Sequence, residues 1–440
     1  MKKLLPLMLA GSLFAGGTQA ADLLSVYREA LEYDAQFAAA RAALDAGREK
    51  LPQGRSGLLP TLSVAANTTW NDVDSKARAT QALTERKYNS AGWTATLTQP
   101  LFRWQNWVAY TQSEMSVAIA EAQFSAAKMD LIVRTAQAYF DVLLAQDALA
   151  TAQAQKTAIA EQLESAKRNF EVGTATITDT HEAQARFDLV TAQELAAESD
   201  LNVKRHAFQI LIGKAPEGLR RLKSGVSLAP PQPADMNKWV DLAETGAITV
   251  QVAQANLEVA QQEIQRQRAG HYPTLDLVAT RGRSSASAAS LSSTGGSDSN
   301  SSTVGLSLTV PLFSGGSVMS KDREAVALKE KAMADLNTAR RTAALSARQA
   351  YLGVTSGLAQ VRAYEAALTS STSAVDSTKL GYEVGVRINI DVLNAQTQLY
   401  DTRQKLAKAR LDTLAALLKL KAAAGTLSDE DLQAVNLLLD

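Results

Sequence analysis

The chain has 440 residues, of which 46% are hydrophobic but only 5% aromatic. Small apolar side chains, alanine above all, therefore dominate, and they favour long, closely packed helices. Basic and acidic residues balance at 45 each, which excludes a general attraction to nucleic acid. Because no cysteine is present, we expect neither disulfides nor thiolate chemistry, nor a lipid anchor on an N-terminal cysteine.

A secretory signal is predicted over residues 1–20. Lys2 and Lys3 form a basic start, an apolar run follows from Leu4 to Ala15, and small residues precede a cleavage point after Ala20. Beyond this segment no run approaches the ~18 consecutive apolar residues of a membrane-spanning helix. We therefore expect an exported protein that can enter a membrane only as strands.

The rest of the sequence contains one unit twice. FEVGTATITDTHEAQ at 170–184 matches YEVGVRINIDVLNAQ at 382–396, and proline landmarks keep nearly the same offset. These landmarks are Pro60 with Pro273, and Pro100 with Pro311. Repeats of this kind indicate a duplicated structural unit. We assign the first repeat to 21–230 and the second to 231–440, joined by a proline-rich linker.

Each repeat is expected to contain the same elements in the same order. An alanine-rich helical stretch (22–55; 236–269) runs into a proline, after which apolar and small polar residues alternate as in strands. A polar loop, serine-rich at 284–302 in the second repeat, divides these strands into a hairpin. The first repeat then comprises a hairpin at 60–100, a long helix at 104–170 and a helix at 179–212. The second comprises a hairpin at 273–311, a long helix at 316–382 and a helix at 391–424.

The long helices predict coiled coils. Neither contains proline, and each would extend ~100 Å at 1.5 Å per residue, far more than a globular core requires. In the second repeat, apolar side chains recur every seven residues, which is typical of a left-handed coiled coil. The heptad positions are Val361, Leu368, Val375 and Tyr382 before the turn, and Val392, Leu399, Leu406, Thr413 and Leu420 after it.

The duplicated turn is predicted to be the tip of each helical hairpin. Gly173 and Gly385 stand where a helix ends and a left-handed residue is needed. Asp179 and Asp391 stand where the next helix begins and a side-chain acceptor is needed. Capping alone is sufficient to explain these residues, so a functional role needs further support.

The strands predict an oligomer. Four strands in lipid leave two unpaired edges, so the sheet must close with other copies. Two copies give eight strands with a filled interior, whereas three give twelve with a lumen. Ser, Thr, Asn and Gly on one face suit a water-filled lumen. A soluble sandwich would need a second sheet, which the pattern does not predict.

Together these features resemble the TolC family of outer-membrane channel-tunnel proteins, over essentially the whole chain after the signal. The specific features are the duplicated unit, the PLF sequence at each strand-to-helix junction, and VGxxxxxD at each tip. The resemblance implies an α+β membrane protein. It would be a trimer whose twelve-stranded outer-membrane β-barrel, with four strands per chain, continues into a long α-helical coiled-coil tunnel in the periplasm.

The resemblance also implies a function and partners. The protein would be the outer-membrane exit duct of a tripartite system for type I protein secretion or small-molecule efflux. Its partners would be two further copies, a periplasmic adaptor (membrane fusion) protein, an inner-membrane transporter of the ABC or RND type, and outer-membrane lipid. Nucleic acid, cofactors and metals are not expected. A tunnel lined with small polar residues does not specify the cargo.

Three groups of site residues follow from the family pattern. A latch that holds neighbouring coiled coils corresponds to Tyr382, Arg387, Asp179 and Thr178. The pore constriction, which carries two acidic positions in the family, corresponds to Asp391 and Asn394, so the second carboxylate is absent here. Contacts with the adaptor are assigned to the tip residues Gly173, Thr174, Gly385 and Val386.

Arg387 is the chemically distinctive member of the latch. Its planar guanidinium can bind a carboxylate such as Asp179 through two hydrogen bonds, strongly enough to join helices and weakly enough for a partner to break. The alternative interpretation is a solvated surface arginine, since exposed ion pairs contribute little.

Two other classes of protein are weighed against this one. An enzyme is not expected, because His181, His206 and His271 lie far apart and no H-E-x-x-H, G-x-S-x-G or phosphate-loop motif occurs. A trimeric coiled-coil surface adhesin with a barrel anchor remains the alternative function. Such an adhesin would carry its strands at one end of the chain, whereas here each repeat contains a hairpin.

Overall fold

The computed structural model describes residues 21–80, 83–215, 218–223, 225–287 and 296–440. The predicted signal at 1–20 lies outside them. Two compact units result: unit 1 comprises residues up to 39 with 126–247 and 342–440, and unit 2 comprises 40–125 and 248–341.

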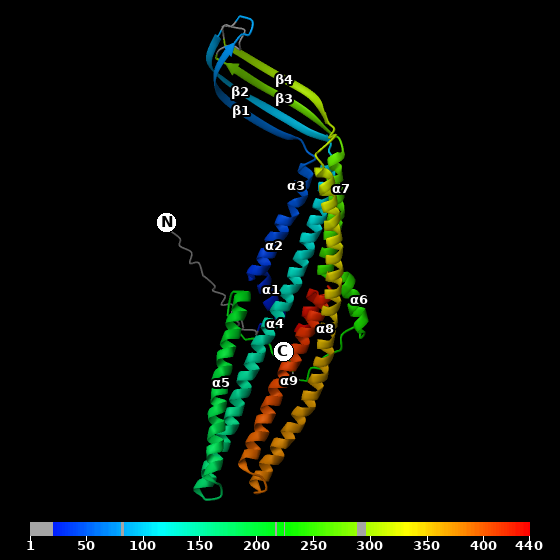
Figure 1. Cartoon of the computed structure of the whole chain (residues 1–440). Coiled ribbons are helices and arrows are strands. Elements are labelled where there is room, and N and C mark those ends of the chain that lie inside the picture. The colour runs from blue at the N-terminus through cyan, green and yellow to red at the C-terminus, as the bar shows by residue number, and fades with distance from the viewer. Residues whose placement is uncertain (1–20, 81–82, 216–217, 224, 288–295) are drawn as a thin grey trace, which may run out of the picture. The chain divides into compact units, whose positions relative to one another are not determined.

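Unit 2 contains a four-stranded antiparallel sheet in the order β1-β2-β3-β4 (Figure 1). The strands are β1 Thr61–Lys76, β2 Leu83–Phe102, β3 Thr274–Ala286 and β4 Ser297–Thr309. The predicted four strands per chain are thus confirmed. The two hairpins, which lie far apart in the sequence, join through β2 and β3 into one sheet.

The prediction that 284–302 is a loop is wrong at both ends. β3 continues to Ala286 and β4 begins at Ser297, with Ser284 paired to Ser299. Residues 288–295 lie outside the described residues. Main-chain hydrogen bonds form a β-ladder whatever the side chains are. The serine-rich composition therefore could not show where these strands end.

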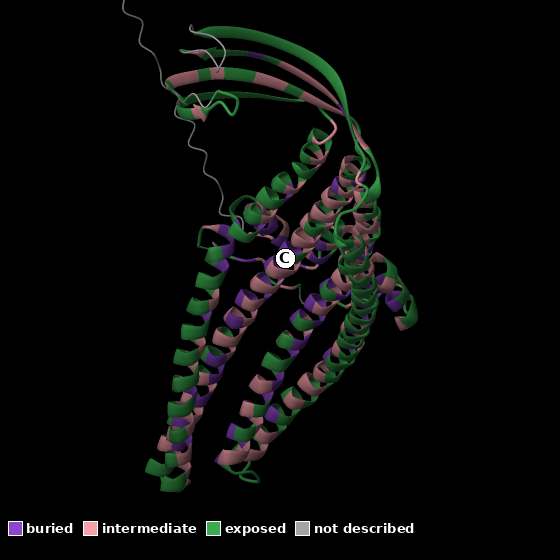
Figure 2. Ribbon diagram, turned by 45° about the horizontal axis from the view of Figure 1, so that its top comes forward, coloured by how far each residue is buried: buried purple, intermediate pink, exposed green. Residues whose placement is uncertain are grey.

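The two faces of the sheet differ in chemistry. Residues directly opposite each other in an antiparallel ladder point to the same side. One row across all four strands is Leu62, Leu97, Ala279 and Val304, and the next row is Ser63, Thr96, Thr280 and Thr303. In the polar row the hydroxyls of Thr280 and Thr303 are 2.6 Å apart. The edge strand β4 is exposed along its whole length, as Figure 2 shows.

The alanine-rich stretches are each broken into shorter helices, which corrects the prediction of continuous helices. The first becomes α1 Leu23–Tyr33, α2 Ala35–Arg48 and α3 Lys50–Ser56. The second becomes α6 Met236–Gly246, α7 Ile248–Arg268 and the short 3-10 helix η1 Ala269–His271.

Asp34 causes the first break. Its backbone is extended, and its side chain accepts a hydrogen bond from the Phe37 N–H at 2.6 Å, which caps α2. Arg134 donates two further hydrogen bonds to the same carboxylate, at 2.9 and 3.1 Å. These bonds hold the pKa of Asp34 below its usual range. The break therefore contains an ion pair whose carboxylate is buried, since the Asp34 side chain is only 8% exposed while that of Arg134 is 31% exposed.

The long helices are present. α4 Trp104–Glu171 has 68 residues and α8 Ser317–Glu383 has 67, and each is followed after a short turn by α5 Ile177–Ile212 or α9 Asn389–Ala423 (Figure 1). A short helix, α10 Asp429–Asn436, follows α9. No helix among the described residues combines the length and the apolarity needed to cross a membrane.

The heptad positions form the contact between α8 and α9. Val361 and Val375 of α8 are buried, as are all five predicted positions of α9 from Val392 to Leu420. Val361 packs with Leu406 and Ala409 in one cluster, and Leu368 packs against it. Buried residues accordingly follow the facing sides of these helices (Figure 2).

Candidate functional site at the helical tips

The two tips of unit 1 have the same backbone. Gly173 and Gly385 both adopt φ of 79°, which confirms the predicted left-handed residue at the end of α4 and of α8. Gly173 donates to the carbonyl of Phe170 at 3.0 Å, and Gly385 donates to that of Tyr382 at 3.1 Å. Nothing lies within 4 Å of a Cβ built on either glycine, so conformation rather than space requires glycine here.

At the first tip the helix start is capped by a reciprocal pair. Thr176 is the N-cap and its hydroxyl accepts from the Asp179 N–H at 3.3 Å. The Asp179 carboxylate in turn accepts from the N–H and hydroxyl of Thr176 at 2.9 and 2.8 Å. The prediction of Asp179 as the N-cap is therefore wrong by three positions, because threonine takes that role and aspartate completes the capping box. Thr178 lies between them and is exposed.

The second tip lacks this cap. Ile388 is the N-cap residue and offers no side-chain acceptor, so the prediction of Asp391 as the N-cap is also wrong by three positions. The Asp391 carboxylate lies 3.6 Å from Arg387 Nη1, with side chains 35% and 62% exposed. Among the described residues Arg387 therefore pairs with Asp391, and the Asp179 carboxylate is hydrogen-bonded to Thr176. The predicted pairing of Arg387 with Asp179 is not made inside one chain and stays a prediction about neighbouring copies.

Tyr382 joins the two hairpins. Its hydroxyl accepts a hydrogen bond from Asn169 Nδ2 at 3.0 Å, which links α8 to the end of α4. Asn394, at the second predicted constriction position, accepts from Arg186 of α5 at 2.8 Å. These contacts bring α8 and α9 against α4 and α5, although their residues are about 210 apart in the sequence.

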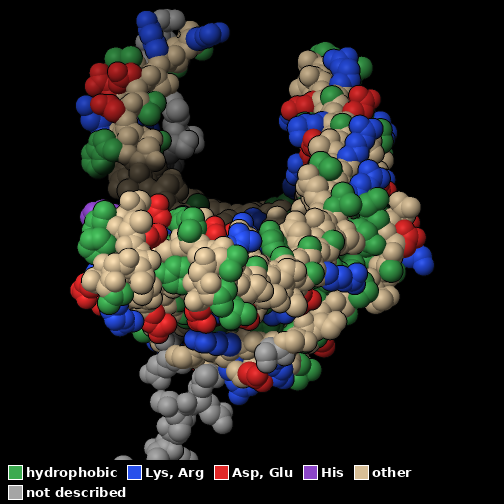
Figure 3. All heavy atoms as spheres, turned by 90° about the horizontal axis from the view of Figure 1, so that it is seen from below, with side chains coloured by type: hydrophobic (Ala, Val, Ile, Leu, Met, Phe, Trp, Pro, Cys, Tyr) green, Lys and Arg blue, Asp and Glu red, His purple; other side chains and the backbone are tan. Residues whose placement is uncertain are grey.

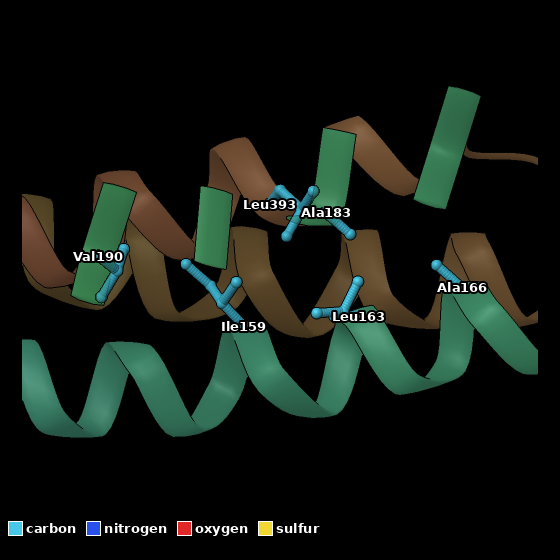
Figure 4. Close-up of a cluster of buried hydrophobic side chains, with 6 residues drawn as sticks. All are labelled: Ile159, Leu163, Ala166, Ala183, Val190 and Leu393. Atoms are coloured by element: carbon cyan, nitrogen blue, oxygen red, sulfur yellow. The ribbon is translucent and has the colours of Figure 1, made fainter. Parts of the chain in front are cut away.

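A buried joint that the sequence did not reveal completes this contact. Leu393 of α9 is fully buried in a cluster with Ile159, Leu163, Ala166, Ala183 and Val190 of α4 and α5 (Figure 4). Asn389, only 1% exposed, accepts from Gln162 Nε2 and donates to the Asp179 carbonyl at 3.3 Å. In the sequence, the one sign of this contact is that Asn389 is a polar residue between Ile388 and Ile390. The first repeat has the apolar Ile177 at the matching position.

The ends of the tips are apolar and exposed. Val172, Val384, Val386 and Ile388 are each more than 60% exposed, around the two glycines. Elsewhere basic and acidic side chains are interspersed over the face that Figure 3 presents, in keeping with the balanced composition. Exposed apolar residues gathered at a loop indicate a contact with another protein. Among the described residues no group of three or more His, Asp and Glu side chains is placed to hold a metal ion.

A four-stranded sheet with one exposed apolar face, paired long-helix hairpins and duplicated apolar tips are typical of channel-forming outer-membrane proteins. The chain belongs to the outer membrane efflux protein family, whose sequence profile matches it twice, over residues 26–214 and 239–426. These two matches fall in the two halves that the internal repeat indicates.

Relatives cover nearly the whole chain. The outer membrane protein TolC of Vibrio cholerae is 34% identical over 438 residues, 99% of this chain and 98% of that protein. The alkaline protease secretion protein AprF of Pseudomonas aeruginosa is 34% identical over 417 residues, 94% of this chain and 86% of the relative.

Solved structures share the fold. The outer membrane protein VceC of Vibrio cholerae superposes with a TM-score of 0.76 at 20% identity, over 92% of this chain and 96% of that one. The CmeC outer membrane channel of Campylobacter jejuni gives 0.79 at 16% identity, over 95% and 90%. The α+β fold of long helices and a four-stranded sheet is therefore that of outer-membrane channels.

Proposed function

We propose that this protein is the outer-membrane exit duct of a tripartite export system that serves type I protein secretion or small-molecule efflux. The observation that carries this proposal is the full-length family match together with the doubled hairpin and long-helix unit. The sheet would sit in the outer membrane and the helices would extend into the periplasm. A duct performs transport by shape and gating, so the proposal assigns no catalytic residue.

Three copies would complete the barrel. β1 and β4 form the edges of the sheet, and an open edge in lipid leaves main-chain groups without hydrogen bonds. Twelve strands from three chains remove every edge and leave a lumen. The Ser, Thr, Asn and Gly face would line that lumen, while the Leu and Val face would meet lipid. Because the two repeats pair within one sheet, the chain also departs from the adhesin arrangement.

The tips would receive a periplasmic adaptor, which connects the duct to an inner-membrane transporter of the ABC or RND type. Gly173, Thr174, Gly385 and Val386 form the ends of the two hairpins, and the valines beside them are exposed. Covering these apolar side chains would stabilise the complex. Adaptor binding would thereby act directly on the helices that carry the gate.

The gate would consist of the contacts just above the tips. Tyr382 and Arg387 of one copy would hold Thr178 and Asp179 of the next, while Tyr382 also holds Asn169 within its own chain. Asp391 and Asn394 would lie at the narrowest point. Three copies of Asp391 would concentrate negative potential there and favour cations.

Two experiments test the proposed function. The full chain in detergent should be a trimer by light scattering, and it should form channels in planar bilayers. A monodisperse monomer without channel activity would contradict the proposal, because four strands cannot close alone.

The second experiment tests the tips. Gly385→Pro should abolish export in cells while trimers remain, since proline cannot adopt φ of 79°. The matched control is Gly225→Pro, which places the same strain at φ of 75° away from the tips, in the segment that follows α5. Normal export by Gly385→Pro would mean that the tips are caps only.

A further inference from the structure

Two arginines of β3 lie on the apolar face of the sheet. The register pairs Arg283 with Trp93 of β2 and Asn300 of β4, and pairs Arg281 with Ala95 and Ser302. Since paired residues point to one side, both arginines share a face with the row Leu62, Leu97, Ala279 and Val304. The opposite face at this level carries Thr94, Gly282 and Ser301.

This face is otherwise apolar toward the start of β3. Leu62, Val64, Val304, Leu306 and Leu308 all lie on it and are each more than 60% exposed. It is the face that the proposed function places against lipid, and the inference rests on that function in this respect only. Charged side chains on such a face are costly unless they reach the headgroups or find a counter-charge.

The charges of these arginines are not neutralised by the sheet. Arg283 Nη2 lies 3.4 Å from Asp298 Oδ2, but both side chains are more than half exposed, so this pair contributes little. Arg281 is exposed and has no ion-pair partner among the described residues. The other pair on this face, Lys87 with Asp72 at 3.0 Å, is self-contained. β3 therefore presents an excess of positive charge.

The height of Arg281 on the strand matches the outer part of the membrane. It stands six residues beyond Leu275, which is ~20 Å along a strand at ~3.3 Å per residue. A strand tilt of ~40° reduces this to ~15 Å of height, within an apolar band ~25 Å tall. Because β3 starts directly after α7 and η1 and runs away from them, the arginines would lie in the half of the band that faces outward. Long arginine side chains extend from such a position to the headgroups.

We propose that Arg281 and Arg283 bind a phosphate group of a phosphorylated glycolipid in the outer leaflet. Alternate residues on one strand place two guanidinium forks side by side, and such forks match phosphate geometry. Asn300 and Ser302 on β4 offer hydrogen bonds to sugar hydroxyls, and the Trp93 indole offers a flat apolar surface to a sugar ring. The acyl chains would lie along the leucines and valines below.

Gly282 helps to hold the two arginines in place. A Cβ at this position would lie 2.7 Å from the Trp93 carbonyl oxygen and 2.9 Å from Thr94 Oγ1. Glycine therefore allows β2 and β3 to approach closely between the arginines. The bound lipid would rest on a closely paired part of the sheet.

The test uses the full-length trimer in detergent and lipid A with both phosphates as the probe, with binding measured by native mass spectrometry. The Arg281→Gln, Arg283→Gln double variant should bind about a hundredfold more weakly, because removing each guanidinium–phosphate hydrogen-bond pair weakens binding roughly tenfold. Arg86→Gln is the matched control, because Arg86 pairs with Val73 on the opposite face of the same sheet. It should bind lipid A as the unaltered protein does.

Three further arms decide the outcome. Lipid A without phosphates should bind as weakly to the unaltered protein as intact lipid A binds to the double variant. Phosphatidylglycerol should not compete at equal concentration. The glycolipid site would be overturned if dephosphorylated lipid A bound as tightly as intact lipid A, or if phosphatidylglycerol competed with it. It would also be overturned if the double variant bound lipid A as tightly as the unaltered protein does.

A dye attached to the apolar face of the sheet distinguishes failure of the glycolipid site from failure of the proposed function. Since the chain contains no cysteine, Leu306→Cys can be labelled alone with an environment-sensitive dye. Quenching of that dye by nitroxide lipids is expected, because this face should meet the bilayer. If quenching occurs and lipid A binding is unchanged in the double variant, the glycolipid site fails and the barrel stands. If quenching is absent, the barrel itself fails.

Discussion

Leu393→Ala should loosen the joint between the two helical hairpins and open the channel. Leu393 is fully buried on α9, against Ile159 and Leu163 of α4 and Ala183 of α5. Among the described residues, Leu393 supplies the one α9 side chain in the buried core of that cluster, and Ile390 packs at its border. Alanine would remove most of the apolar contact that α9 makes with this cluster. It would not change the charge, and it would not lower the helix propensity.

Truncating a buried leucine costs ~2–5 kcal/mol, because transfer free energy is lost and a cavity remains. If opening separates α9 from α4 and α5, the closed state alone bears this cost. At the lower limit of ~2 kcal/mol the opening equilibrium of each chain shifts about 30-fold toward the open state. Single-channel recording in planar bilayers should therefore show longer and more frequent openings than in the unaltered protein.

Leu406→Ala is the matched control. Leu406 lies on the same helix with 5% exposure, but its cluster joins α9 to Val361 of α8, inside one hairpin. This variant should lose a similar amount of thermal stability and keep the closed conductance. If Leu393→Ala unfolds at a lower temperature yet conducts like the unaltered protein, the hairpins do not separate on opening and the reasoning is refuted.

Three other outcomes are expected. Arg387→Ser combined with Tyr382→Phe should raise bilayer conductance several-fold, since each hydrogen bond removed contributes about 1 kcal/mol. Unchanged conductance in intact trimers would refute the latch and leave Arg387 as a solvated surface arginine. Asp391→Asn should weaken cation selectivity, measured as reversal potentials. It should also weaken block by polyvalent cations, measured as loss of conductance, while open probability changes little. Asp34→Asn should lower stability at pH 7 by ~1–3 kcal/mol. The folded pKa of Asp34 is lowered, so the carboxylate stabilises the fold above the unfolded value of about 4. The difference between Asp34→Asn and the unaltered protein should shrink as pH falls below the unfolded value and vanish only below the lowered folded pKa, so thermal unfolding should show a smaller difference at pH 3 than at pH 7.

Features encoded by local pattern could be predicted from the sequence. The left-handed glycines follow from a duplicated VG turn, and the α8–α9 contact follows from heptads whose α9 members are all buried. Strand number follows from alternation. Strand ends at Ala286 and Ser297 could not be predicted, because serine is compatible with both loop and ladder and main-chain bonding decides between them.

The helix starts at the tips show how a correct residue receives an incorrect role. Aspartate is a good N-cap, which favours Asp179 and Asp391 for that position, yet both stand at the third helical position. A threonine at 176 supplies the cap in the first repeat, and the S/T-x-x-D spacing is visible in the sequence. The second repeat has Ile388 there, and Asp391 consequently has Arg387 as its neighbour instead.

The joint around Asn389 and Leu393 could not be derived from either repeat alone. It links residues more than 200 apart, and neither copy of the repeat predicts which face of α9 meets α4. The two repeats differ at this point, since Ile177 and Asn389 occupy matching positions. A buried asparagine that bonds to Gln162 and to the Asp179 carbonyl fixes which hairpin faces which. Two otherwise equivalent hairpins thereby become chemically distinct.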